Sequence, residues 1–165
     1  MKQKEVLFVP DGGIAAVVRA LTLYGAQDVE TGGFFLAPAR QWTTVSHVAL
    51  AGERGVLRKR NLFAVSGPAI TMLLDWATVR DCAVVAQFHS HRKGAFLSET
   101  DLEHGFAVTD FVSTVVPTYF SPPQDPAAWG WWRYNGHAWE PAEAAHRFPG
   151  MPTLLLFDED GVRDA

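Results

Sequence analysis

The sequence predicts a single α/β domain over residues 1–165. Short runs rich in β-branched and aromatic residues, such as 83–86 and 111–116, have the length and composition of buried strands. Segments with apolar residues at helical spacing, such as 11–24, lie between them. Apolar residues make up 48% of the chain and charged residues 19%, which is typical of a globular protein. A chain of 165 residues suffices for one hydrophobic core and is too short for two ordinary domains.

The expected elements follow from these patterns and from the turn residues between them. They are a strand at 6–9, a helix at 11–24, strands at 34–37 and 42–50, a helix starting at 66, a strand at 83–86, a helix starting at 98, a strand at 111–116, a β-hairpin around 135–136, a short helix at 141–147 and a strand at 153–157. Residues 53–65 show the least regular pattern. The charge run at 58–60 within them indicates a solvated face or a contact for an acidic partner.

Capping residues support the first two helices. Asp11 is expected to be the N-cap of the first helix, and Gly25 follows its last turn at the C′ position. Ser66 opens the second helix, with Pro68 in the first turn, where a missing backbone N–H is tolerated. Near the end of the chain, Asn135-Gly136 is a strong signal for a two-residue type I′ turn.

That turn predicts the register of a Trp-rich hairpin. It places Tyr134 opposite His137 and Trp132 opposite Trp139, which gives a cross-strand aromatic pair. With Trp129 nearby, this ribbon either closes the hydrophobic core, which is the favoured interpretation, or lines a substrate groove.

The strand at 83–86 leads into His89 and His91. Successive strand side chains point to opposite faces, so these two imidazoles project to the same side, roughly 6.6 Å apart along the strand. Each can reach a metal at about 2.0–2.1 Å, so one zinc ion can bridge them. Taken alone, such a pair is also common in proteins without a metal.

A short glycine-containing loop then leads to the start of a helix at Ser98. Ser98 and Asp101 have the spacing of a capping box, which is a structural role. Asp101 also has the position of a third metal ligand, and three protein ligands with a fourth place for water are typical of catalytic zinc sites. The two interpretations are compatible. His104, three residues beyond Asp101, is expected to have a structural role.

His89-Ser90-His91, the loop and Ser98-x-x-Asp101 resemble the motif of the JAMM (MPN+) metalloproteases. That family also has a glutamate far upstream at the beginning of a strand, and Glu30, before Thr31-Gly32-Gly33, fits this position. The resemblance covers most of residues 5–120. It implies a JAMM/MPN-like, cytidine-deaminase-like domain of the stand-alone prokaryotic type, with a mixed β-sheet flanked by helices. The loop before Ser98 is one residue shorter than in the commonest form of the motif.

The resemblance implies a zinc-dependent peptidase or isopeptidase with one Zn²⁺ per chain. His89, His91 and Asp101 would hold the metal. Glu30 would act as general base, and Ser98 Oγ would donate a hydrogen bond to the developing oxyanion. The expected partner is the C-terminal tail of a ubiquitin-like modifier and its conjugates, in a bacterial conjugation system of the kind that includes antiviral ones. Processing of a sulfur-carrier protein and a non-catalytic scaffold of the same fold are the alternatives.

Composition narrows the remaining classes. A formal net charge of −4 does not favour nucleic-acid binding. The single cysteine, Cys82, excludes a disulfide within this chain and the paired Pro-Cys-x-x-Cys of a zinc nucleobase deaminase. It is expected to be a small buried hydrophobe, not a nucleophile. No N-terminal signal pattern and no apolar run of about 20 residues are present, so a soluble cytoplasmic protein without a membrane partner is expected.

Overall fold

The computed structural model describes residues 5–165 except for the side chain of His104, so the expectation for that histidine lies outside the described part. The helices are α1 (Asp11–Gly25), α2 (Gly67–Val79) and α3 (Glu99–His104), with a 3₁₀ turn η1 at Pro126–Ala128. The strands are β1 (Phe8–Pro10), β2 (Gly32–Pro38), β3 (His47–Ala51), β4 (Val56–Lys59), β5 (Leu62–Val65), β6 (Cys82–Ser90), β7 (Val112–Val116), β8 (Gly130–Tyr134), β9 (Trp139–Pro141), β10 (His146–Phe148), β11 (Thr153–Asp158) and β12 (Gly161–Asp164).

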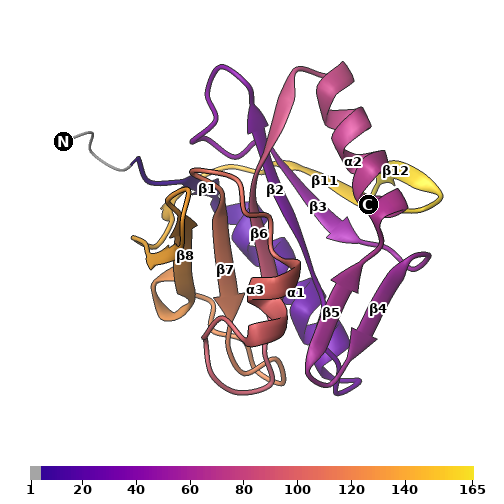
Figure 1. Ribbon diagram of the computed structural model, residues 1–165, viewed down its shortest axis with the longest axis vertical. Coiled ribbons are helices and arrows are strands. Elements are labelled where there is room, and N and C mark those ends of the chain that lie inside the picture. Colours follow the sequence, from indigo (N-terminus) through magenta and orange to yellow (C-terminus); the bar gives the residue numbers. More distant parts are fainter. Residues whose placement is uncertain (1–4) are drawn as a thin grey trace.

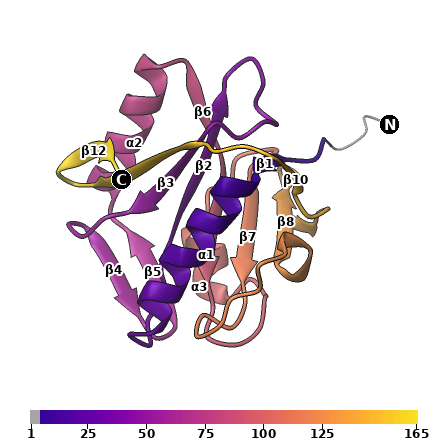
Figure 2. The ribbon, with the colours of Figure 1, turned by 180° about the vertical axis from the view of Figure 1, so that it is seen from behind.

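An eight-stranded sheet forms the centre of the molecule, with the strand order β12-β11-β3-β2-β6-β7-β8-β9 (Figure 1). Both parallel and antiparallel pairs occur, because β6 runs parallel to β7 and β11 parallel to β3 while the other neighbours are antiparallel. Helix α1 covers one face of the sheet, and α2 and α3 lie on the other (Figures 1 and 2). The prediction of a mixed sheet flanked by helices is confirmed.

The two faces of β2 explain why helices cover the sheet on both sides. Alternate residues of a strand point to opposite faces. Phe35 belongs to the same buried cluster as Val17 of α1, whereas the preceding Phe34 belongs to the cluster that contains Leu73 of α2. Burial of each such side chain contributes about 1.5–3 kcal/mol relative to exposure. The sheet therefore separates two hydrophobic clusters, one under α1 and one under α2.

The pairing of β2 with β6 sets the geometry of the candidate site. The two strands are antiparallel, and Gly32 at the start of β2 pairs with His89 near the end of β6. Glu30, just before β2, consequently lies beside the end of the strand that carries the two motif histidines. Residues almost 60 positions apart in the sequence therefore meet where the start of β2 lies beside the end of β6.

The helix boundaries follow the predicted caps closely. Ser66 is the N-cap of α2, and its Oγ accepts a hydrogen bond from the backbone N–H of Ala69 at 3.3 Å. For α1 the prediction is off by one residue. Pro10 holds the N-cap position and Asp11 is the first helical residue, where a negative charge interacts favourably with the helix dipole; Gly25 is the last helical residue rather than C′. Among residues 5–165, no helix is both long and apolar enough to span a membrane.

Residues 53–65 are more regular than their sequence suggests, because β4 and β5 form an antiparallel hairpin there. The charge run 58–60 is also not simply a solvated face. The Arg58 side chain is only 8% exposed, and its Nε donates a hydrogen bond to Thr31 Oγ1 at 2.8 Å. Arg60 pairs with Asp28 at 2.7 Å. Partners that are distant in the sequence therefore determine where the side chains of Arg58 and Arg60 lie.

The C-terminal hairpin has a wider turn than predicted. Asn135 Oδ1 accepts hydrogen bonds from the backbone N–H groups of His137 and Ala138, both at 2.8 Å. This side-chain bridging gives a four-residue loop, so Tyr134 pairs with Trp139 and the predicted Trp132–Trp139 register is wrong. Trp129 and Trp131 are buried and stacked on each other, in agreement with the core-closing interpretation.

The remaining differences concern short elements. Residues 141–147 form no helix: the start of this segment ends β9, and its end lies in β10, which pairs in parallel with β1. The predicted strands at 6–9 and 42–50 appear as the shorter β1 and β3. The final strand at 153–157 is confirmed as β11, and β12 follows it as an additional strand.

Candidate metal centre

His89 and His91 come together at the end of β6. His91 follows the last strand residue, and its backbone N–H donates to the Val116 carbonyl at 2.9 Å, which continues the pairing with β7. Both imidazoles therefore face the same side, as the alternation rule predicts. Their Nε2 atoms are 3.1 Å apart, and both rings are buried.

Asp101 reaches the two histidines from the first turn of α3. Ser98 is the N-cap, and a complete capping box is present: Ser98 Oγ accepts from the Asp101 N–H at 3.1 Å, and Asp101 Oδ2 accepts from the Ser98 N–H at 2.9 Å. The same carboxylate lies 3.2 Å from His89 Nε2 through Oδ1 and 3.1 Å from His91 Nε2 through Oδ2. The predicted compatibility of cap and metal ligand is thus seen in the geometry.

The three donor groups fit a tetrahedral metal ion. The two Nε2 atoms are 3.1 Å apart, and the carboxylate faces His89 through Oδ1 at 3.2 Å and His91 through Oδ2 at 3.1 Å. Ligands at the usual zinc distances of about 2.0–2.2 Å in tetrahedral geometry are about 3.3–3.5 Å apart. One ligand atom from each of the three residues lies within 4.8 Å of the others, so these residues form a group able to hold a metal.

The second nitrogen of each imidazole distinguishes the two rings. His91 Nδ1 lies 3.1 Å from the Gly94 carbonyl; a proton on Nδ1 satisfies that oxygen and leaves the Nε2 lone pair for a metal. His89 Nδ1 is buried and has no hydrogen-bond partner among the described residues. All polar contacts of the His89 ring are therefore on its Nε2 side, within the candidate site.

Burial and hydrogen bonding act in opposite directions on the pKa values of His91 and Asp101. Burial alone would lower the pKa of His91, but the hydrogen bond to Asp101 and the nearby Glu30 raise it above its ordinary value. Burial would likewise raise the pKa of Asp101, yet hydrogen bonds from both imidazoles hold it well below its usual range. Both shifts have the direction expected where a carboxylate stabilises positive charge beside it, and a bound cation would be such a charge.

Glu30, the predicted general base, lies in the segment just before β2. Its side chain is 5% exposed, and its pKa is raised to about 8, mainly by burial; Asp101 raises it further and His91 opposes this. The hydrogen bonds between the adjacent Thr31 and Ser90 place Glu30 beside the end of β6. A buried carboxyl with a perturbed pKa beside a metal-ligand group has the properties of a general acid–base residue.

Gly32 and Gly33 allow β2 to approach its neighbours closely. A Cβ on Gly32 would lie 2.3 Å from the Phe88 carbonyl oxygen and 2.9 Å from His89 Cβ. A Cβ on Gly33 would lie 2.1 Å from the Ala49 carbonyl oxygen. Close backbone approach, and not a bulge, is therefore the reason for glycine at these two positions.

A pocket with a cavity volume of about 120 Å³ opens beside His89 and Asp101, and residues of β5 and α3 line it. Gln87 lies two residues before His89 on β6 and is therefore on the same face; Ser113 is its partner on β7. Both line this pocket. Its apolar walls include Phe34, Phe63, Ile70 and Phe106.

The sequence motif did not indicate every residue at this centre. Gln87 follows from strand alternation with His89, but Ser113 follows only from the pairing of β6 with β7. Phe96 packs edge-on against His91, with 4.8 Å between ring centroids, although it lies in an irregular loop. By contrast, His47 lies outside the metal-ligand group, as expected. Cys82, predicted to be buried, is only partly buried where it packs against the core.

Comparison with known proteins identifies the fold. No protein-family model and no curated protein matches the sequence. A JAB1/MPN domain protein from Archaeoglobus fulgidus superposes with a TM-score of 0.53 at 14% identity, over 87% of this chain and 99% of that one. The chain therefore has a JAMM/MPN-type fold.

Two further solved structures have the same architecture. A protein from Desulfitobacterium hafniense gives a TM-score of 0.66 at 12% identity, covering 88% of this chain and 94% of the other. A protein from Salinibacter ruber gives 0.55 at 20% identity, with the same two coverages. At these identities the likeness concerns the fold alone, so the site must be judged from its own geometry.

Proposed function

We propose that this protein is a zinc-dependent peptidase or isopeptidase that cleaves after the C-terminus of a ubiquitin-like modifier. The observation that carries the proposal is the close approach of three donor groups: the Nε2 atoms of His89 and His91 are 3.1 Å apart, and one Asp101 carboxylate oxygen lies beside each ring, at 3.2 and 3.1 Å. Two imidazoles and one carboxylate leave a tetrahedral ion one open position, as in catalytic zinc sites. When bound, zinc supplies Lewis-acid chemistry, which makes water nucleophilic near neutral pH and polarises a carbonyl.

Glu30 is the proton carrier in this proposal. Its buried carboxyl exchanges a proton near neutral pH even in the metal-free protein, because its pKa is about 8. A cation close by favours the carboxylate and lowers that pKa. Glu30 can then take a proton from the attacking water and return it to the leaving amine.

Ser98 is positioned to assist without leaving its structural role. Its Oγ accepts the Asp101 N–H, so its hydroxyl hydrogen remains available for donation. Directed at the carbonyl under attack, this hydrogen stabilises the developing negative charge. Loss of one such donor typically costs about 10²–10³ in turnover.

The surroundings of the site support an extended substrate. Strand β5 pairs only with β4 within the described part of the chain, so its other edge is open to a peptide strand. The pocket lies between that edge and α3. A flexible modifier tail can pair along β5 and bring its terminal carbonyl to His89 and Asp101. A modifier tail from a bacterial conjugation system satisfies this requirement.

The proposal is tested by metal loading and cleavage together. Purified protein is expected to bind one Zn²⁺ per chain and to cleave lysine-linked conjugates or linear fusions of bacterial ubiquitin-like proteins, with a sulfur-carrier fusion as a separate substrate arm. A chelator should abolish cleavage. Glu30→Gln should retain zinc and lose about 10²–10⁴ in turnover. His47→Ala, which alters a histidine outside the cluster, is the matched control and should retain both properties.

Each part of this experiment distinguishes the proposed function from one alternative. Cleavage of the sulfur-carrier fusion alone would assign the protein to carrier processing. Stoichiometric zinc without cleavage of any substrate would favour the scaffold interpretation. Normal cleavage by Glu30→Gln, or undiminished cleavage in chelator, would contradict the proposed chemistry.

A further inference from the structure

The β4–β5 hairpin forms hydrogen bonds with Glu30 and with the next residue, Thr31. The backbone N–H of Glu30 donates a hydrogen bond to the Lys59 carbonyl, the last residue of β4, at 2.8 Å. The neighbouring Arg58 reaches the next residue of the same segment, because its Nε donates to Thr31 Oγ1 at 2.8 Å. Two consecutive residues of β4 therefore hold the two residues that immediately precede β2.

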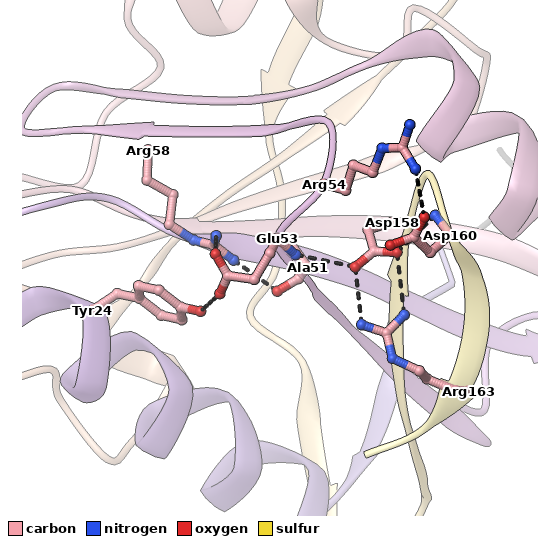
Figure 3. A network of polar contacts seen from close by, with 8 residues as sticks. All are labelled: Tyr24, Ala51, Glu53, Arg54, Arg58, Asp158, Asp160 and Arg163. Atoms are coloured by element: carbon pink, nitrogen blue, oxygen red, sulfur yellow. Dashed lines mark hydrogen bonds and ion pairs between the residues drawn. The ribbon is translucent and has the colours of Figure 1, made fainter.

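The guanidinium of Arg58 is fixed on several sides (Figure 3). Besides Thr31, it donates through Nη2 to the Ala51 carbonyl at 2.7 Å. It lies over the Tyr24 ring, 3.9 Å from the centroid, and Nη1 is 3.7 Å from Glu53 Oε2. A planar guanidinium held by directional bonds and an aromatic face has little freedom to move. Arg58 is thus a rigid anchor behind Glu30.

Thr31 joins this anchor to the strand that carries the metal ligands. Its backbone N–H donates to Ser90 Oγ at 3.0 Å, and its carbonyl accepts the Ser90 N–H at 2.9 Å. Ser90 stands between His89 and His91, and both Thr31 and Ser90 are buried. The chain from Arg58 through Thr31 to Ser90 therefore fixes the distance between Glu30 and the metal-ligand strand.

We propose that Arg58, acting through the Thr31 hydroxyl, is a positioning residue for Glu30, which makes the β4–β5 hairpin part of the catalytic apparatus. The inference rests on the proposed function for its catalytic consequence, but the positioning itself concerns the protein alone. Arg58 contacts the residue next to Glu30, so its effect is on geometry, and a displacement of about 1 Å at a reacting group can cost about 10² in rate.

Thr31→Val and Thr31→Ser form the decisive pair. Valine keeps the shape of threonine but removes the acceptor for Arg58 Nε, whereas serine keeps that hydroxyl. We expect Thr31→Val to lower kcat about 10- to 100-fold with KM and zinc stoichiometry unchanged, and Thr31→Ser to restore most of kcat. Arg58→Lys should resemble Thr31→Val, because a single ammonium cannot serve both the Thr31 hydroxyl and the Ala51 carbonyl.

A second readout does not depend on catalysis. Amide hydrogen exchange at Glu30 reports the bond to the Lys59 carbonyl, and it should be at least tenfold faster in Thr31→Val and in Arg58→Lys than in wild type or Thr31→Ser. Arg54→Met is the matched control. Arg54 is 69% exposed and pairs with Glu159 and Asp160 on the other side of Glu53, so its removal should change neither exchange at Glu30 nor kcat.

Opposite outcomes are equally clear. Wild-type kcat and wild-type exchange in Thr31→Val would overturn the proposal, as would a loss of kcat that follows zinc content or that Thr31→Ser fails to restore. If wild-type protein cleaves no substrate, the proposed function fails, while the exchange comparison still decides whether Arg58 holds Glu30 in place.

Discussion

Asp101 combines two tasks in one carboxylate. Its Oδ2 accepts the Ser98 N–H of the capping box and also faces His91 Nε2. The cap fixes the side-chain rotamer, because the carboxylate must reach back over the first turn of α3. A residue whose spacing in the sequence has a purely structural explanation is thereby held within 3.2 Å of both imidazoles. The Ser-x-x-Asp pattern therefore predicts where the aspartate side chain points, which an aspartate alone does not.

Glu30 leads to a prediction about the metal-free protein. Its pKa in the folded state is about 8, against an ordinary value of 4.5, so the folded state binds this proton more tightly than the unfolded chain. The free energy of unfolding therefore falls as the pH rises from about 4.5 to about 8 through this group. Glu30→Gln removes the contribution. In chelator, the variant should be more stable than wild type at pH 8 and show no such gain at pH 5.

Urea denaturation of both proteins at the two pH values measures this difference. Wild type and variant should also converge at pH 8 when Zn²⁺ is added, because a cation favours the Glu30 carboxylate. The same stability gain at both pH values would show that glutamine merely packs better and that the Glu30 pKa is not raised.

At the scale of elements, local chemistry predicted the helices better than the strand pairs. Ser66 and Ser98 act as N-caps through bonds to residues three positions away, so the sequence contains the whole interaction. Strand β4 was missed because its charged residues looked solvated. Arg58 is buried by Thr31 and Ala51, one of which lies 27 residues away, and no local pattern reveals such partners.

Gly32 leads to a prediction about the close packing of β2 against β6. Gly32→Ala should destabilise the protein by at least about 1–3 kcal/mol and weaken zinc binding, because the new Cβ would lie 2.3 Å from the Phe88 carbonyl oxygen and push on His89. Urea denaturation and competitive zinc titration measure the two effects. In Gly67→Ala, no atom lies within 4 Å of the added Cβ, so this control should change stability by less than about 1 kcal/mol. Equal behaviour of the two variants would show that β2 has room to move.

At the scale of the whole molecule, the convergence of the site depends on sheet order. The spacing of His89, His91, Ser98 and Asp101 predicted a ligand group, and a family resemblance indicated Glu30. Glu30 reaches the group only because β2 pairs antiparallel with β6. The C-terminal part of the sheet was harder to predict, since β11 pairs in parallel with β3, joining Thr153 to His47. Such pairing is decided by the closed core, not by neighbouring residues.

Asp158 ties this C-terminal part to the rest of the fold. Only 1% exposed, it accepts hydrogen bonds from the Glu53 N–H at 3.1 Å and from Arg163 Nη2 at 2.9 Å. A Cβ on Gly52 would lie 2.2 Å from its Oδ2. The carboxylate thus sits directly against the turn between β3 and β4, and it links β12 to the hairpin that contains Arg58 (Figure 3).

Asp158→Asn is therefore expected to lower the free energy of unfolding at pH 7 by about 2–3 kcal/mol. The hydrogen bonds from Arg163, aided by those from the backbone of Glu53 and Asp160, lower the Asp158 pKa to about 2 although burial opposes this. A depressed pKa means that the stabilisation is fully present above the unfolded value near 4 and is lost as the pH falls towards 2.

Denaturation of wild type and Asp158→Asn between pH 7 and pH 2 should show the two curves of unfolding free energy approaching each other in that window. Asp75→Asn, at an exposed position on α2, is the control and should run parallel to wild type. A constant gap for Asp158→Asn down to pH 2 would mean that its charge does not hold the two parts together.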